Sequence, residues 1–95
     1  MNHKVNLQEL SGLELLQYHR EIGKLFEKLS GEQFEPDLLE RLCECAVLGF
    51  YSLKDENGAA VYSSPEEVLR TIPFRELVKI PEEYELCFPE GDTTE

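Results

Sequence analysis

The stretch DENGAAVYSSPEEV, residues 55–68, combines a tight turn, a short extended run and the start of a helix. Asn57 and Gly58 favour the positive φ angles that sharp chain reversals need. Ser64 suits the N-cap of a helix, Pro65 suits its first position, and Glu67 completes a capping box. No set of catalytic side chains accompanies these signals. The stretch therefore predicts a small helical scaffold with one ordered connector rather than an enzyme.

A first long helix is predicted upstream, over about residues 11–30. Ser11 suits the N-cap and Glu14 the third helical position, which together form another capping box. Gly23 lies inside this helix, where it costs about 1 kcal/mol relative to Ala, so we expect a neighbouring helix to cross closely there. Apolar residues recur at the three- and four-residue spacing of one helix face. They are Leu15, Tyr18, Ile22, Leu25, Phe26 and Leu29.

A second long helix is predicted over about residues 36–51, opened by Pro36. Its apolar residues cover so much of the circumference that we expect a central helix, covered on more than one side. They are Leu38, Leu39, Leu42, Cys45, Ala46, Val47, Leu48, Gly49, Phe50 and Leu53. Two endings fit the sequence. Either the helix runs to about Tyr51 and a loop follows, or residues 51–62 form a short β-hairpin that needs a helix to pack on.

The last third of the chain is punctuated by prolines. Pro65, Pro73 and Pro81 each suit the start of a short helix. Proline is tolerated in the first turn of a helix, and it disfavours helical geometry in the residue before it. We therefore predict short C-terminal helices that fold over the two longer ones.

Ninety-five residues are enough for one modest hydrophobic core. We predict a single domain over residues 1–95, with flexible termini at residues 1–6 and 89–95. The predicted fold class is mainly α. It is a small single-domain helical bundle of two longer helices plus short C-terminal helices, with the β-hairpin around residues 51–62 as an open alternative.

The formal net charge of −11 is the most unusual feature of the composition. So much negative charge repels phosphate backbones and anionic membranes, so we expect neither nucleic-acid binding nor membrane binding. It favours a protein partner with amphipathic or basic helices. The alternative function is an acidic regulatory or inhibitor protein that mimics nucleic acid or binds a basic partner. Acid excess also serves simply to keep small proteins soluble.

The three cysteines, Cys43, Cys45 and Cys87, raise the question of thiol chemistry. The sequence shows neither a signal-peptide pattern nor an apolar run of membrane length, so we expect free thiols in the cytoplasm. Cys43 and Cys45 have C-x-C spacing, and no second cysteine pair supplies further zinc ligands. We predict no catalytic residues, no metal and no cofactor. An enzyme that uses Cys45 or Cys87 is the alternative that fast thiol alkylation would reveal.

Aromatic residues are the candidates for a partner-binding surface, because the predicted helices cannot readily bury them all. The six candidates are Tyr18, Phe34, Tyr51, Tyr62, Phe74 and Tyr84. Aromatic anchors within an acidic rim suit an amphipathic helix that carries Lys or Arg. Burial of most of them in the core is the competing interpretation.

Helix punctuation recurs in the segments LSGLELL (residues 10–16), LKDENGAAVYSSPEEV (53–68) and IPFREL (72–77). With the leucine-rich second helix between them, this layout resembles the tail assembly chaperones of long-tailed bacteriophages and prophages, over about residues 7–88. The resemblance implies a small, helical, non-catalytic protein of the bacterial host cytoplasm. It also implies that the protein coats the tape-measure protein during tail assembly and forms homo-oligomers. The hairpin-like segment and the late prolines depart from the family pattern.

Overall fold

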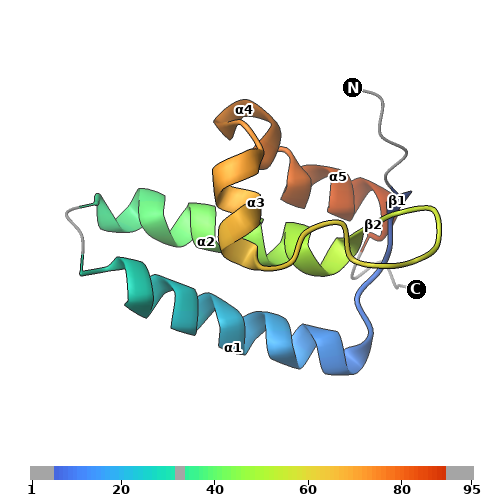
Figure 1. Ribbon diagram of the computed structural model, residues 1–95, viewed down its shortest axis with the longest axis horizontal. Helices are drawn as coiled ribbons and strands as arrows, with labels where there is room; N and C mark the ends of the chain where they lie inside the picture. Colours follow the sequence, from blue (N-terminus) through green and yellow to red (C-terminus); the bar gives the residue numbers. More distant parts are fainter. Residues whose placement is uncertain (1–5, 32–33, 90–95) are drawn as a thin grey trace.

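The computed structural model describes residues 6–31 and 34–89 of the chain (Figure 1). This part is mainly helical, which confirms the predicted fold class. Residues 1–5 and 90–95, which belong to the predicted flexible termini, lie outside the described residues. In chain order, the elements are β1 (Asn6–Leu7), α1 (Gly12–Leu29), α2 (Pro36–Ser52), β2 (Leu53–Lys54), α3 (Pro65–Thr71), α4 (Phe74–Leu77) and α5 (Ile80–Cys87).

Both long helices begin at the residues that their local signals indicate. At the start of α1, the Glu14 backbone N–H donates to Ser11 Oγ at 3.1 Å, and the Ser11 N–H donates to Glu14 Oε1 at 2.9 Å. These two bonds satisfy N–H groups that a helix end would otherwise leave unpaired. At the start of α2, the Glu35 carboxylate accepts from the Leu38 N–H at 3.1 Å, next to Pro36 in the first turn.

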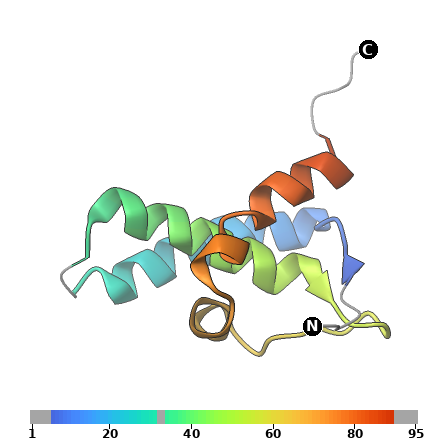
Figure 2. The ribbon, with the colours of Figure 1, turned by 90° about the horizontal axis from the view of Figure 1, so that it is seen from above.

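The central position predicted for α2 is confirmed. It contacts α1, α3, α4 and α5, and in Figures 1 and 2 it runs between α1 and the C-terminal helices. Its middle is the least exposed part of the molecule, because helices cover it on several sides. The buried residues of α2 are Leu39, Cys43, Cys45, Ala46, Val47, Leu48, Gly49 and Ser52.

The close helix crossing lies on α2, not on α1 as the sequence led us to expect. A Cβ atom at Gly49 would lie 3.0 Å from Ile80 Cδ1 and 3.5 Å from Val68 Cγ1, because α5 and α3 meet α2 there. A Cβ atom at Gly23 would have no neighbour within 4 Å, and Gly23 is exposed. The expectation of a helix packed on Gly23 within this chain is therefore wrong, because α1 turns its opposite face to α2.

A short antiparallel ladder joins the segment before α1 to the segment after α2. Asn6 pairs with Lys54 and Leu7 with Leu53, so β1 adds itself to the free edge of β2. Asn6, which the sequence predicts to lie in a flexible terminus, pairs through its backbone with Lys54. The backbone groups of β2 would otherwise form an open edge, which explains why the segment before α1 adds to it.

The connector after β2 forms the tight turn that its sequence predicts. The Asp55 carboxylate accepts from the Ala59 N–H at 3.0 Å, and the Asp55 N–H donates to the Ala59 carbonyl at 2.9 Å. Gly58 has a φ of +82°, the left-handed conformation that favours glycine. One isolated bridge, Lys54 to Ala60, closes the turn. Of the two endings that the sequence allows, the structure has the helix running to Ser52 with a connector after it. Of the alternative hairpin, this one bridge and a bond from the Val61 N–H to the Leu53 carbonyl at 3.4 Å are present.

Candidate functional site

The six candidate aromatics do not gather on one face of the molecule. Tyr18 and Tyr84 line the same hollow, of about 420 Å³, beside α1 and α5. Tyr51 and Tyr62 are half-buried and pack against the core. The remaining two, Phe34 and Phe74, are the exposed ones, at 52% and 60% of their full surface. As members of a binding surface, the six residues stay a prediction.

Tyr84 has a structural role in this hollow, and Tyr18 is partly buried in it. The Tyr84 hydroxyl accepts from the Leu10 backbone N–H at 2.9 Å, so it ties α5 to the segment that leads into α1. Burial raises the pKa of Tyr18, and the Glu44 carboxylate raises this pKa further. Both effects keep the Tyr18 hydroxyl protonated. The hollow is mixed in character, because the carboxylates of Glu9 and Glu85 share its wall.

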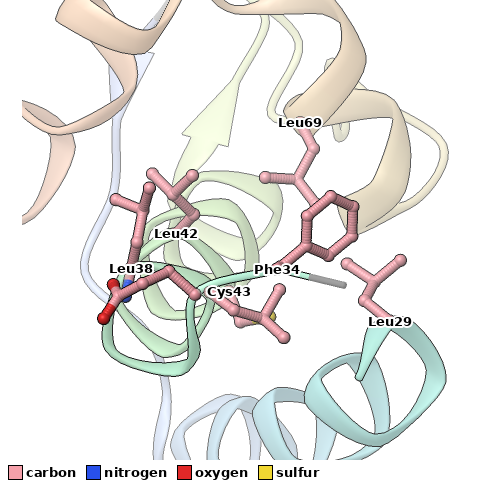
Figure 3. Close-up of a pocket in the computed structure, with 8 residues that line it drawn as sticks. Leu29, Phe34, Leu38, Leu42, Cys43 and Leu69 are labelled. Carbon is pink, nitrogen blue, oxygen red and sulfur yellow. The ribbon is translucent and has the colours of Figure 1, made fainter. Parts of the chain in front are cut away.

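A second cavity, which we call the apolar cleft, lies beside the N-terminal half of α2. Its volume is about 230 Å³. Figure 3 shows the Phe34 ring between Leu29 and Leu69, with Leu38 and Leu42 projecting from α2 beside it. The lining residues are Leu29, Phe34, Glu35, Leu38, Leu39, Leu42, Cys43 and Leu69.

Three segments build the apolar cleft. Leu38 and Leu42 are four residues apart on α2, so they share one face of that helix. Leu29 is the last residue of α1 and Phe34 lies two residues before α2, so both come from the region where the chain passes from one long helix to the next. Leu69 comes from α3. The helix α3 meets α2 near Gly49 through Val68, and Leu69 forms one wall of the cleft.

The apolar cleft offers exposed apolar surface with one carboxylate, that of Glu35, in its lining. Phe34 is 52% exposed and Leu38 is 44% exposed, although burial of such side chains is worth about 1.5–3 kcal/mol each. Glu35 is the charged member of the lining, and its carboxylate is held by the Leu38 N–H. Asp37, Glu40 and Glu44 are exposed elsewhere on α2, as is Arg41, and none of these four residues lines the cleft.

Sequence reasoning identified Phe34 but missed the leucines around it. Leu29, Leu38, Leu42 and Leu69 all occupy positions of helix faces that the sequence predicts to be core. The sequence does contain one signal for the cleft, because the apolar face of α2 is longer than the helix that packs on it. The apolar face of α2 spans the whole helix, whereas α3 has only 7 residues with which to cover it.

The two cysteines of α2 are core residues. Cys43 is 0% exposed and Cys45 is 1% exposed. Burial raises the pKa of Cys43 to about 11, and nearby Glu44 and Glu40 add to this effect. Burial also raises the pKa of Cys45, although Arg41 partly opposes it. Both are therefore neutral thiols at pH 7 and poor nucleophiles, whereas Cys87 is exposed.

The described part of the chain has neither a cluster of metal-binding side chains nor a helix suited to cross a membrane. Within residues 6–31 and 34–89, no group of three or more His, Cys, Asp or Glu side chains is placed to hold a metal ion. In the same residues, none of the helices combines the length and the apolar character that crossing a membrane requires.

Comparison of the chain with protein-family models, with curated proteins and with solved structures finds no match in any of the three. The resemblance to tail assembly chaperones thus rests on the sequence patterns of the chain alone.

Proposed function

We propose that this protein is a non-catalytic chaperone that binds amphipathic helical segments of another protein. By its resemblance to tail assembly chaperones, the partner is the tape-measure protein of a phage tail, covered in the cytoplasm of the bacterial host before the tail is complete. The apolar cleft is the observation that supports this proposal. It has exposed Phe34 and Leu38, a floor of buried Leu39 and Cys43, and the Glu35 carboxylate in its lining.

The chemistry of the cleft favours one class of ligand. An amphipathic helix presents anchors at positions i, i+3, i+4 and i+7 along one face, and a hydrophobic groove between helices is the usual receptor for it. Lys or Arg on the polar face of the ligand would meet Glu35, and the net charge of −11 would attract such a ligand. The core thiols support a non-catalytic function, because burial keeps Cys43 and Cys45 protonated.

A peptide titration tests the proposal. A fluorescent peptide with an apolar helical face and a Lys-rich polar face should bind, whereas a permuted peptide of the same composition should not. We expect Phe34→Ala to weaken binding about tenfold, which corresponds to about 1.4 kcal/mol. Fluorescence anisotropy measures the dissociation constant.

Phe74→Ala is the matched control, because Phe74 is an equally exposed aromatic that does not line the cleft. It should leave the affinity unchanged. Equal binding of both peptides would contradict the proposal and favour the acidic mimic, which attracts positive charge in any order. Co-expression with a tape-measure protein then tests the identity of the partner, since a chaperone should keep that protein soluble and co-purify with it.

A further inference from the structure

The side of α1 that faces away from α2 carries a continuous stripe of exposed residues. Its members follow alternating steps of three and four, the spacing of a helix–helix contact. All six are exposed, and in Figure 1 α1 forms one edge of the molecule. We call these residues the outer stripe: Leu13, Leu16, Arg20, Gly23, Glu27 and Ser30.

Two features of the outer stripe have no explanation within the chain. Leu13 and Leu16 are 65% and 70% exposed, among the most exposed large apolar residues of the described part. Gly23 weakens the helix, yet apart from the adjoining helix backbone no described atom lies within 4 Å of the space that a Cβ would occupy. A stripe that offers exposed leucines and, two turns further along, a glycine with no side chain allows a second helix to pack closely.

The charge of α1 indicates that the second helix is α1 of another copy of this chain. Although the whole chain has a net charge of −11, α1 contains three acidic and three basic residues and is neutral. Two copies of the chain repel each other through most faces, but not through this one. The six residues are Glu14, Glu21 and Glu27 against Arg20, Lys24 and Lys28.

The order of charges along the outer stripe is self-complementary. Arg20 lies on one side of Gly23 and Glu27 on the other, and among the described residues neither takes part in an ion pair. When two α1 helices lie antiparallel and cross at Gly23, Arg20 of each copy lies opposite Glu27 of the other. A parallel arrangement would instead place Arg20 against Arg20.

We propose that the protein forms a two-fold symmetric homodimer in which the outer stripes pack antiparallel, with paired Arg20 and Glu27 contacts around Gly23. Symmetric dimers of this kind use the same surface on both subunits, so each contact occurs twice. The proposal is independent of the proposed function, because the outer stripe and the apolar cleft share no residue.

Charge exchange in the full chain tests this dimer by sedimentation velocity over a range of concentrations. Arg20→Glu or Glu27→Arg alone should weaken association about tenfold or more, because each places two like-charge pairs in the interface. The double variant R20E/E27R should restore association to the wild-type level. It has the same net charge as the wild type, and only the antiparallel pairing predicts this rescue.

Arg75→Glu is the control for net charge, since Arg75 is exposed on α4 and lies outside the outer stripe. It should leave association unchanged. A wild-type protein that stays monomeric at every concentration overturns the proposal. So does a double variant that associates as weakly as the single variants, or an Arg75→Glu variant that associates as weakly as Arg20→Glu.

Discussion

Gly23 and Gly49 lie in the two long helices, and their surroundings differ in a way that composition alone does not reveal. Gly49 is buried where Ile80 and Val68 approach α2, so it has a packing role. Gly23 is exposed with open space around it. A glycine inside a helix costs the same backbone entropy in either place. Only its neighbours decide whether that cost is offset within the chain.

We expect Gly23→Ala to raise the free energy of unfolding by about 1 kcal/mol, because Ala favours the helix and its Cβ meets open space. Urea denaturation at low protein concentration, where the monomer prevails, measures this change. At high concentration the same substitution should weaken self-association, since a Cβ at the crossing separates the two α1 helices. A loss of monomer stability would contradict the surroundings described for Gly23.

Gly49→Ala is the matched control. Its Cβ would lie 3.0 Å from Ile80 Cδ1, and both Ile80 and Val68 are buried, so they have little room to move. Overpacking of this kind costs about 1–3 kcal/mol and more than offsets the gain in helix propensity. We expect a net loss of stability, opposite in sign to the effect at Gly23.

At the scale of elements, the helix starts were predictable because each is encoded within a few neighbouring residues. Ser11 with Glu14, and Ser64 with Pro65, carry their capping signals locally. The pairing of β1 with β2 joins residues far apart in the sequence, and its two-residue strands are too short to show an alternating pattern. The apolar cleft was not predictable either, because it depends on where α3 crosses α2.

The cap of α3 also shows how a local signal is met by a different bond from the one expected. Ser64 Oγ accepts from the Glu67 N–H at 3.2 Å, as a capping box requires. Glu67 Oε1, however, accepts from the Ser63 N–H at 2.7 Å and from the Ser63 hydroxyl at 2.8 Å. The carboxylate thus fixes the residue before the N-cap rather than the N-cap itself.

This arrangement predicts a pH-dependent contribution of the α3 cap to stability. The hydrogen bonds from Ser63 lower the pKa of Glu67 below its ordinary value of 4.5. A carboxyl whose pKa is lower in the folded state stabilises the fold above its unfolded pKa. That stabilisation is lost as the pH falls through the folded pKa. We expect the Tm difference between the wild type and Glu67→Gln to be largest near neutral pH and to vanish in acid.

Thermal unfolding followed by circular dichroism, between about pH 7 and pH 3, measures that difference. Ser63→Ala is a partial control, because it removes one of the two donors and should reduce the pH-dependent part of the effect. A Tm difference that is the same in acid and at neutral pH would exclude the proposed role of the Glu67 carboxylate.

At the scale of the whole molecule, charge and burial differ from one part of the chain to another. The helix α1 is neutral and exposes its outer stripe, whereas α2 lines the apolar cleft with leucines and has Glu35 at its N-cap. The middle of α2 holds Cys43 and Cys45 where helices cover it on several sides. Reaching these two thiols therefore requires the packing around α2 to open, so their reactivity reports on the integrity of the whole fold.

Thiol alkylation should accordingly separate the three cysteines. In the folded protein at neutral pH, iodoacetamide should modify the exposed Cys87 at once and leave Cys43 and Cys45 unmodified, because both are buried and their pKa values are raised. In urea, all three should react at similar rates. Peptide mass spectrometry over time assigns the modified residues. Fast modification of Cys45 in the folded state would instead favour an enzyme that uses this thiol. It would contradict the burial and the raised pKa of Cys45, on which the non-catalytic interpretation depends.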